Sequence, residues 1–155
     1  MTKIEFLDTL RAERARIEAA LGKQTEAQLI YRAAPDQWSL KDTLAHLTYF
    51  EQYMLERVQR ALLGETPRWV TDEEETENAR VFERNKERPL VRVLADMHLS
   101  LADVLEQVES MSEADLTDPN RFAWMKGKPL WSYIANEAYG EHYHDHLQQL
   151  LEQGS

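Results

Sequence analysis

Apolar side chains recur every three or four residues over four long stretches of the chain, which is the spacing of amphipathic α-helices. Thr2 and Glu5 form a capping-box pattern before the first stretch, and Gly22 suits the end of a helix. A helix is therefore predicted from about Lys3 to Leu21. Its apolar stripe consists of Ile4, Leu7, Leu10, Ile17 and Leu21.

A second helix is predicted from about Ser39 to Leu63, after a loop over residues 31–38. Ser39 is a good N-cap, and Asp42 lies in the first turn, where the helix dipole favours an acid. Gly64 suits the end of this helix. The apolar stripe consists of Leu40, Leu44, Leu47, Met54, Val58 and Leu62.

Two further long helices are predicted, from Pro89 to about Met111 and from Pro129 to about Gln153, because proline favours the first turn of a helix. Residues 73–86 suit a short exposed helix, and no strand-like alternation is present. The pattern predicts an all-α fold, a four-helix bundle with long connections between helices 2 and 3 and between helices 3 and 4. We expect one domain over residues 1–155.

The composition narrows the chemistry that such a bundle can perform. With 18 basic and 28 acidic side chains, the formal net charge is −10, which argues against binding to nucleic acid or to an anionic membrane. The absence of cysteine excludes disulfides, iron–sulfur clusters and thiol nucleophiles, so a metal site must use imidazole or carboxylate groups. No window of about 18 apolar residues predicts a membrane span, and the amphipathic N-terminus is unlike a signal peptide. We expect a cytoplasmic protein.

Two histidines on the last predicted helix are candidate metal ligands. His142 and His146 are four residues apart, so both imidazoles can face one ion, whereas His144 lies on the opposite side. Asp145 lies between the two ligand turns, where it can orient an imidazole. The pair alone is equally compatible with a surface or interface role. The same face continues an apolar stripe of Trp131, Ile134, Ala135 and Ala138.

A third histidine, His46, flanks the apolar stripe of the second helix. A lone histidine in such a place is commonly a buried one whose nitrogen bonds a carbonyl. If the second and fourth helices are neighbours with a suitable stagger, however, His46 can meet His142 and His146 at one level. Three imidazoles would hold Zn²⁺, Ni²⁺, Mn²⁺ or Fe²⁺ and leave coordination positions open. His98 has no partner at helical spacing.

Two segments resemble motifs of a known family. The segment 38–47, WSLKDTLAHL, resembles the Trp-Ser-x-Lys-Asp-x-x-x-His signature of DinB-like (DinB/YfiT) proteins. The segment 141–146, EHYHDH, resembles the His-x-x-x-His motif near the end of their fourth helix. The resemblance covers most of the chain, including helix order and loop lengths. From Asn78 to the loop before Pro129 the chain is also similar to the ClbS/DfsB-type branch.

The resemblance implies a four-helix bundle that forms a homodimer and holds a divalent metal at the matching positions His46, His142 and His146. Similar proteins include thiol transferases that use bacillithiol or mycothiol, a thiol-dependent isomerase and a cyclopropane hydrolase that protects against a genotoxin. We therefore expect a metal-dependent hydrolase, or a transferase that uses a low-molecular-weight thiol. Its substrate would be a small electrophile, in detoxification or stress response. A non-catalytic metal- or ligand-binding bundle and a metal site that only stabilises a dimer remain alternatives.

Aromatic and acidic residues near the candidate ligands complete the predicted site. Glu51 is either a carboxylate that orients an imidazole or a solvated or inter-helix residue, and the acidic run 72–77 is expected to be solvated. Core packing is the favoured role for Phe50 and Trp131. The candidate cleft walls are Trp38, Phe50, Tyr53, Trp124, Trp131 and Tyr139.

Overall fold

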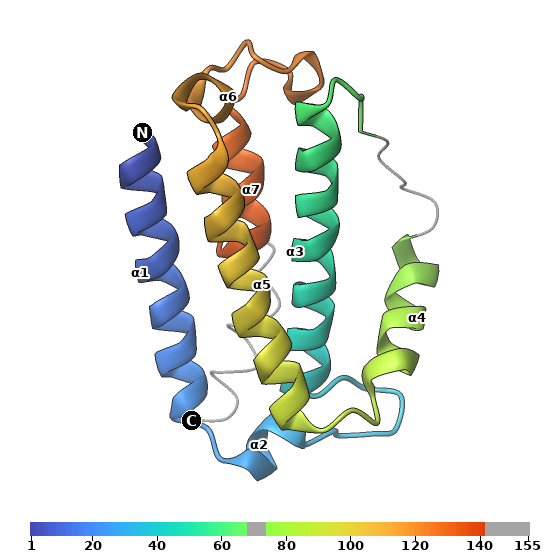
Figure 1. Cartoon of the computed structure of the whole chain (residues 1–155). Coiled ribbons are helices and arrows are strands. Elements are labelled where there is room, and N and C mark those ends of the chain that lie inside the picture. Colours follow the sequence, from blue (N-terminus) through green and yellow to red (C-terminus); the bar gives the residue numbers. More distant parts are fainter. Residues whose placement is uncertain (68–73, 142–155) are drawn as a thin grey trace.

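The computed structural model describes residues 1–67 and 74–141, and each regular element in these ranges is helical (Figure 1). The all-α prediction is therefore confirmed. None of the described helices combines the length and apolarity that a bilayer crossing requires. The elements are α1 (Lys3–Gly22), α2 (Glu26–Ile30), α3 (Leu40–Leu62), α4 (Glu74–Asn85), α5 (Leu90–Ser110), α6 (Glu113–Thr117), a 3₁₀ helix η1 (Ala123–Met125) and α7 (Leu130–Ala138).

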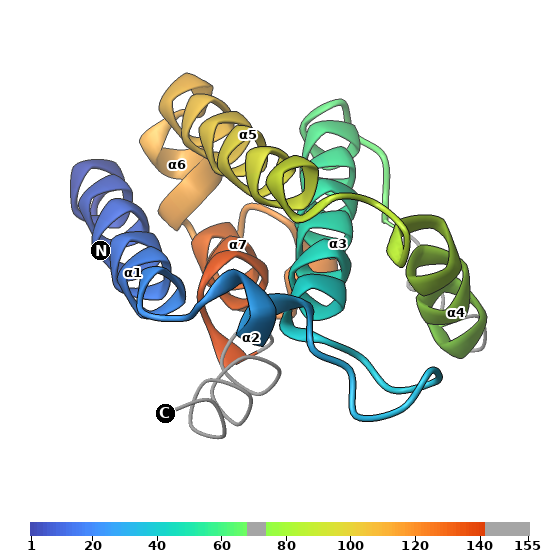
Figure 2. The same cartoon turned by 90° about the horizontal axis from the view of Figure 1, so that it is seen from below.

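Helices α1, α3, α5 and α7 pack around a common core, and α4 lies outside this group against α3 (Figure 2). Helix α4 runs back along α3, so α5 begins at the same end of the bundle as α3 and is parallel to it (Figure 1). Helices α1 and α7 run in the opposite direction. The long connection predicted between the second and third long helices thus contains the return helix α4.

The apolar core consists of two clusters along the bundle axis. The larger includes Leu10 of α1, Met54 of α3 and Val104 of α5, together with most of the buried face of α7. The smaller lies toward α2 and includes Leu47 and Met97. A polar network of Arg14, Glu51 and Ser100 occupies the boundary between the two clusters.

One residue of the predicted α1 stripe does not face the core. Ile4 is 70% exposed, whereas Phe6, which the stripe did not include, is fully buried. At 100° per residue, Ile4 points about 95° away from the mean direction of Leu7, Leu10 and Leu21, while Phe6 lies about 65° from it. The helical phase of the later residues therefore decides which side chain is buried.

The local sequence pattern predicted the short helices less well than the long ones. Residues 73–86 were predicted as an exposed helix, and α4 occupies Glu74–Asn85, but its Val81 is buried against the bundle. Helices α2 and α6, five residues each, were not predicted. Gly64 follows α3 with φ +92°, the left-handed conformation that glycine adopts without steric cost, as expected for a helix end.

The prediction of one unbroken helix from Pro129 to Gln153 is wrong, because α7 ends at Ala138. Tyr139 leaves the helical conformation with φ −156° and ψ −4°. The N–H groups of Tyr139 and Gly140 both donate to the carbonyl oxygen of Ala135, at 3.0 and 2.7 Å. Two donors converging on one carbonyl interrupt the regular hydrogen-bond ladder. The predicted continuation from His142 lies outside the described residues.

Gly140 is needed for this close approach, and we expect Gly140→Ala to lower the free energy of unfolding by about 1–3 kcal/mol. A Cβ atom there would lie 2.8 Å from the Cα of Asn136 and 2.9 Å from the carbonyl oxygen of Ala135, so the backbone must shift. Gly22→Ala is the matched control, because nothing lies within 4 Å of its Cβ position. Urea unfolding of both variants measures the difference, and equal stability of the two would contradict the steric explanation.

Candidate functional site

His46 lies in the second turn of α3 and is only 3% exposed. Its imidazole packs between two aromatic rings, with ring centroids 5.1 Å from Trp38 and 4.8 Å from Phe50. Both contacts are tilted, at interplanar angles of 55° and 53°. The ring is therefore held in one orientation by rigid neighbours, as a metal ligand or a binding-site residue must be.

The residues that precede His46 in the signature motif build the first turn of α3. The Oγ of Ser39 accepts the N–H of Asp42 at 3.1 Å, and the carboxylate of Asp42 accepts the N–H of Ser39 at 2.8 Å. This is a reciprocal capping box that satisfies two donors at the helix start. Arg32 donates to both oxygens of the same carboxylate, at 2.7 Å each. Burial alone would raise the pKa of Asp42, but the hydrogen bonds from Arg32 and Ser39 outweigh it and hold the pKa below 3.8.

Asp42→Asn is expected to lower the free energy of unfolding by about 1–3 kcal/mol at neutral pH, because it removes the charged acceptor of Arg32. The folded-state pKa of Asp42 lies below its ordinary value of 3.8, so this stability is present above pH 3.8 and lost as the pH falls through the folded pKa. The difference between wild type and variant should therefore shrink in acid. Urea unfolding over a pH series measures it, with Asp36→Asn, at an exposed loop position, as control.

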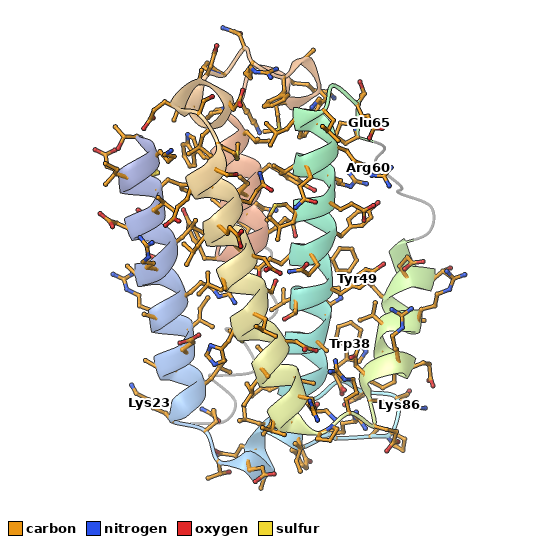
Figure 3. The ribbon with its side chains drawn as sticks, viewed as in Figure 1. Lys23, Trp38, Tyr49, Arg60, Glu65 and Lys86 are labelled. Carbon is orange, nitrogen blue, oxygen red and sulfur yellow. The ribbon has the colours of Figure 1, made fainter. Side chains whose placement is uncertain are left out.

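The same motif also anchors the end of α4 against the start of α3. The Nζ of Lys41 donates to the carbonyl oxygens of Lys86 and Arg88, at 2.9 and 2.7 Å. The Trp38 ring stacks on Phe82 of α4, with an interplanar angle of 3° and centroids 6.0 Å apart. Figure 3 shows Trp38 and Lys86 close to where α3 starts and α4 ends. Trp38 therefore contacts α4 and the candidate ligand His46 at once.

A buried ion pair crosses the bundle next to this region. Arg14 of α1 and Glu51 of α3 are both fully buried, and an Nη1 hydrogen of Arg14 is donated to Oε2 of Glu51. The hydroxyl of Ser100 donates to the other oxygen of Glu51, and Arg14 also donates to the Met97 carbonyl oxygen at 3.1 Å. Burial raises the pKa of Glu51. The positive charge of Arg14 and the hydrogen bonds from Arg14 and Ser100 lower it, but burial has the larger effect.

This ion pair also connects the two elements that carry the predicted ligands. The Nη1 of Arg14 lies within hydrogen-bond distance, 3.4 Å, of the carbonyl oxygen of Ala138, the last residue of α7. Glu51 follows His46 by five residues, and Ala138 precedes His142 by four. Of the two roles considered for Glu51, an orienter of an imidazole and an inter-helix residue, the described contacts are inter-helical.

Arg14 was missed by the sequence analysis although a signal for it was present. It falls between Leu10 and Ile17 on the buried face of α1, at the spacing of the apolar stripe. A cation at a core position requires a buried partner, because an unpaired charge there is too costly. The sequence does not say that the partner is Glu51, 37 residues later.

Tyr53 extends the row of aromatic rings that starts at Trp38 and His46. Its ring lies 6.3 Å from that of Phe50 in an edge-on contact, and its hydroxyl accepts a hydrogen bond of 2.6 Å from Arg57. Phe50 is half-buried and contacts His46, so it belongs to this row. The structure thus brings Trp38, His46, Phe50 and Tyr53 together along α3.

The other predicted wall residues lie with the core cluster near α7. Trp124 belongs to η1, at the opposite end of the bundle from the start of α3, and packs edge-on against Tyr133 at 6.0 Å. The ring centroids of Trp131 and Phe6 lie 6.0 Å apart, as expected for a core residue. Tyr139 caps α7, and burial, together with Glu13, raises its pKa.

His142, Asp145 and His146 lie outside the described residues, so the structure places one of the three predicted ligands. Within residues 1–67 and 74–141, no three His, Asp or Glu side chains are grouped so as to hold a metal ion. His98 is exposed on the surface of the bundle, where its Nδ1 atom lies 2.9 Å from Oε1 of Glu18. The tris-histidine set therefore stays a prediction.

Comparison with known families adds the decisive observation. A family model described as the DinB superfamily matches residues 9–150, a range that contains all three candidate ligands. The chain belongs to the DinB superfamily. Neither the curated proteins nor the solved structures gave a match. The match is at the level of the superfamily, in which metal binding is general.

Proposed function

We propose that this DinB-superfamily protein is a divalent-metal-dependent enzyme that acts on a small electrophilic molecule, with His46, His142 and His146 as the metal ligands. The reaction is hydrolysis or transfer to a low-molecular-weight thiol. The observation that carries the proposal is the position of His46. It is buried in an aromatic wall near the level at which α7 ends, four residues before His142.

The chain connectivity supports a meeting of these ligands. Arg14 contacts both Glu51 and the carbonyl oxygen of Ala138, so the end of α7 lies level with Glu51 on α3. His46 is five residues nearer the start of α3, about 7.5 Å along the axis. Because α7 runs opposite to α3, His142 must lie further toward the start of α3 to meet His46 (Figure 1). Four residues span about 6 Å as a helix and about 13 Å extended, which is enough.

The donor groups fit a divalent transition metal. Imidazole suits Zn²⁺, Ni²⁺, Mn²⁺ and Fe²⁺, and the chain has no cysteine that would favour a thiolate site. When bound, the ion would supply Lewis acidity and lower the pKa of a coordinated water or thiol. A thiol used by this protein must come from a small molecule, because the chain has none of its own.

Neighbouring side chains have definable tasks in this reaction. Trp38 and Phe50 fix the plane of the His46 imidazole and keep water from its faces. The Tyr53 oxygen accepts a hydrogen bond from Arg57, which leaves its O–H proton to donate to a substrate oxygen or leaving group. We place the activity in detoxification or stress response, carried out by a cytoplasmic homodimer.

Purification without chelator, followed by elemental analysis, tests the metal; a panel of electrophiles with and without low-molecular-weight thiols tests the reaction. We expect a divalent metal bound in stoichiometric amount, and turnover that is lost on chelation and restored by the metal. A protein that stays metal-free after dialysis against zinc or nickel would contradict the proposal. Bound metal without turnover on any electrophile would favour a non-catalytic binding bundle.

A further inference from the structure

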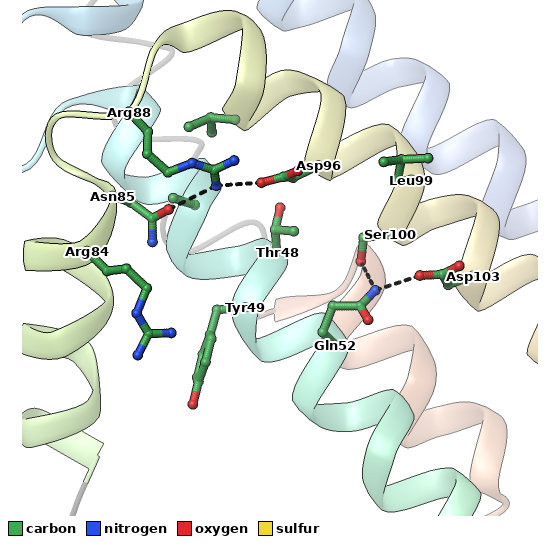
Figure 4. Close-up of a pocket in the computed structure, with 12 residues that line it drawn as sticks. Thr48, Tyr49, Gln52, Arg84, Asn85, Arg88, Asp96, Leu99, Ser100 and Asp103 are labelled. Carbon is green, nitrogen blue, oxygen red and sulfur yellow. Dashed lines mark hydrogen bonds and ion pairs between the residues drawn. The ribbon is translucent and has the colours of Figure 1, made fainter.

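A cavity of about 340 Å³ lies between α3, α4 and α5 (Figure 4). Its lining does not include His46. Its α3 wall is formed by Ala45, Thr48, Tyr49 and Gln52, and at 100° per residue His46 points about 110° away from their mean direction. Ligands in the two places would therefore contact different faces of α3.

The cavity contains a buried hydroxyl that the described protein does not satisfy. Thr48 is 9% exposed, and its Oγ1 forms no hydrogen bond with any residue in the described ranges. Figure 4 shows this oxygen pointing toward the space below Arg88 and Asp96. A buried hydroxyl without a partner costs free energy, so its orientation toward the cavity indicates a place for a polar ligand atom.

The charges of the wall are balanced. Arg84 lies in α4, and Arg88 lies in the connection between α4 and α5. Asp96 and Asp103 lie in α5, so the formal charges of the four side chains cancel. Arg88 is already paired with Asp96. Arg84 forms no hydrogen bond or ion pair with a described residue, and Figure 4 shows it across the pocket from Asp103. The carboxylate of Asp103 accepts a hydrogen bond of 3.2 Å from the side-chain amide of Gln52.

We propose that this pocket binds a small zwitterion, with its carboxylate at Arg84, its ammonium group at Asp103 and a polar atom of its centre at the Thr48 hydroxyl. A simple anion would leave Asp103 unfavourably close, and a simple cation would do the same with Arg84. The cavity is at the small end of the usual range for ligand sites. A dipeptide carries both charges, about 7 Å apart when it is extended, and is small enough for a cavity of this volume.

Alanyl-alanine is a suitable probe, with its N-acetyl and C-terminal amide derivatives as probes that each lack one charge. Isothermal titration calorimetry should detect binding of the dipeptide and at least about tenfold weaker binding of each derivative. Arg84→Gln should weaken binding of the dipeptide by about tenfold. Arg80→Gln is the matched control, because Arg80 lies on the same helix, paired with Glu77 and outside the pocket wall.

Thr48→Val separates binding from folding. It replaces the hydroxyl by a methyl group of similar size, so binding should weaken severalfold while the unfolding midpoint stays equal or rises. Failure of alanyl-alanine to bind at up to about 10 mM would overturn the proposal, as would equal binding by the Arg84→Gln and Arg80→Gln proteins. Because the pocket uses none of the proposed metal ligands, binding should be the same before and after chelation, whatever the outcome for the metal.

Discussion

Arg14→Met is expected to lower the free energy of unfolding by about 3–5 kcal/mol, more than any surface substitution in this protein. Methionine fills much of the volume of arginine but leaves the Glu51 carboxylate buried with only the Ser100 hydroxyl as donor among the contacts described above. It also removes the donors to the carbonyl oxygens of Met97 and Ala138. Urea unfolding at neutral pH measures the loss.

The double variant Arg14→Met/Glu51→Leu and the surface variant Arg60→Ala are the controls. Removing both charges should recover a large part of the stability, because the cost of the single variant lies mainly in the unpaired carboxylate. Arg60→Ala breaks an exposed i,i+4 pair with Glu56 and should cost less than about 1 kcal/mol. If Arg14→Met costs no more than Arg60→Ala, the ion pair does not stabilise the fold as proposed.

The pH dependence of Arg14→Met gives a second, independent readout. Burial raises the pKa of Glu51 in the wild type, and removal of the cation would raise it further. A group whose folded pKa is above its unfolded value costs stability once it ionises, so the loss in Arg14→Met should shrink as the pH falls toward 4.5. The stability difference thus shrinks in acid for both variants, although the pKa of Glu51 is raised and that of Asp42 is lowered.

The position of this ion pair explains why a bundle with two apolar clusters keeps charges in its centre. The polar network of Arg14, Glu51 and Ser100 lies at the boundary between the two clusters. On its two sides are Leu10, which belongs to the larger cluster, and Leu47 and Met97, which belong to the smaller one. Apolar residues at this place would let the helices pack at several positions along one another. The hydrogen bonds of Arg14 to two backbone carbonyl oxygens are directional, so they select a single position. The same contacts set the end of α7 relative to α3, on which the proposed metal site depends.

Local signals were sufficient for α1, α3 and α5, and insufficient for the end of α7 and for the short helices α2 and α6. The start of α3 follows from Ser39 and Asp42, which are three residues apart and satisfy each other. The end of α7 depends instead on a glycine whose hydrogen approaches the Ala135 carbonyl closely, and a helical pattern runs through Gly140 without a break. Periodicity reports which face is apolar and does not report backbone contacts of this kind.

The candidate site was predictable to the extent that its residues are neighbours in sequence. The motif around His46 was identified by its resemblance to the DinB-like signature, and its capping function is local. The contact of Lys41 with the Lys86 carbonyl joins residues 45 positions apart, so the anchoring of α4 could be read only from the structure. The pocket at Thr48 and Arg84 is of the same kind, since it needs three helices to be in place.

His142→Ala and His46→Ala should each weaken metal binding by more than about 100-fold, because the loss of a direct ligand exceeds the 10–100-fold effect typical of residues that only orient one. His144→Ala and His98→Ala are the controls. His144 shares the segment of His142 but was predicted to face away, and His98 is an exposed histidine paired with Glu18. All four variants remove one imidazole, so a general loss of histidine cannot explain a difference between the pairs.

Metal content after purification and a competition titration with a chelator of known affinity measure the effect. The unfolding midpoint with and without metal adds a readout that does not depend on activity, since a ligand that binds only the folded state raises the midpoint. Saturating metal should raise the midpoint of wild type, His144→Ala and His98→Ala, and leave that of His46→Ala and His142→Ala almost unchanged. Full metal occupancy in His142→Ala would refute the tris-histidine site. Loss of metal in His144→Ala as well would instead show that the chain after Gly140 presents its histidines in another register.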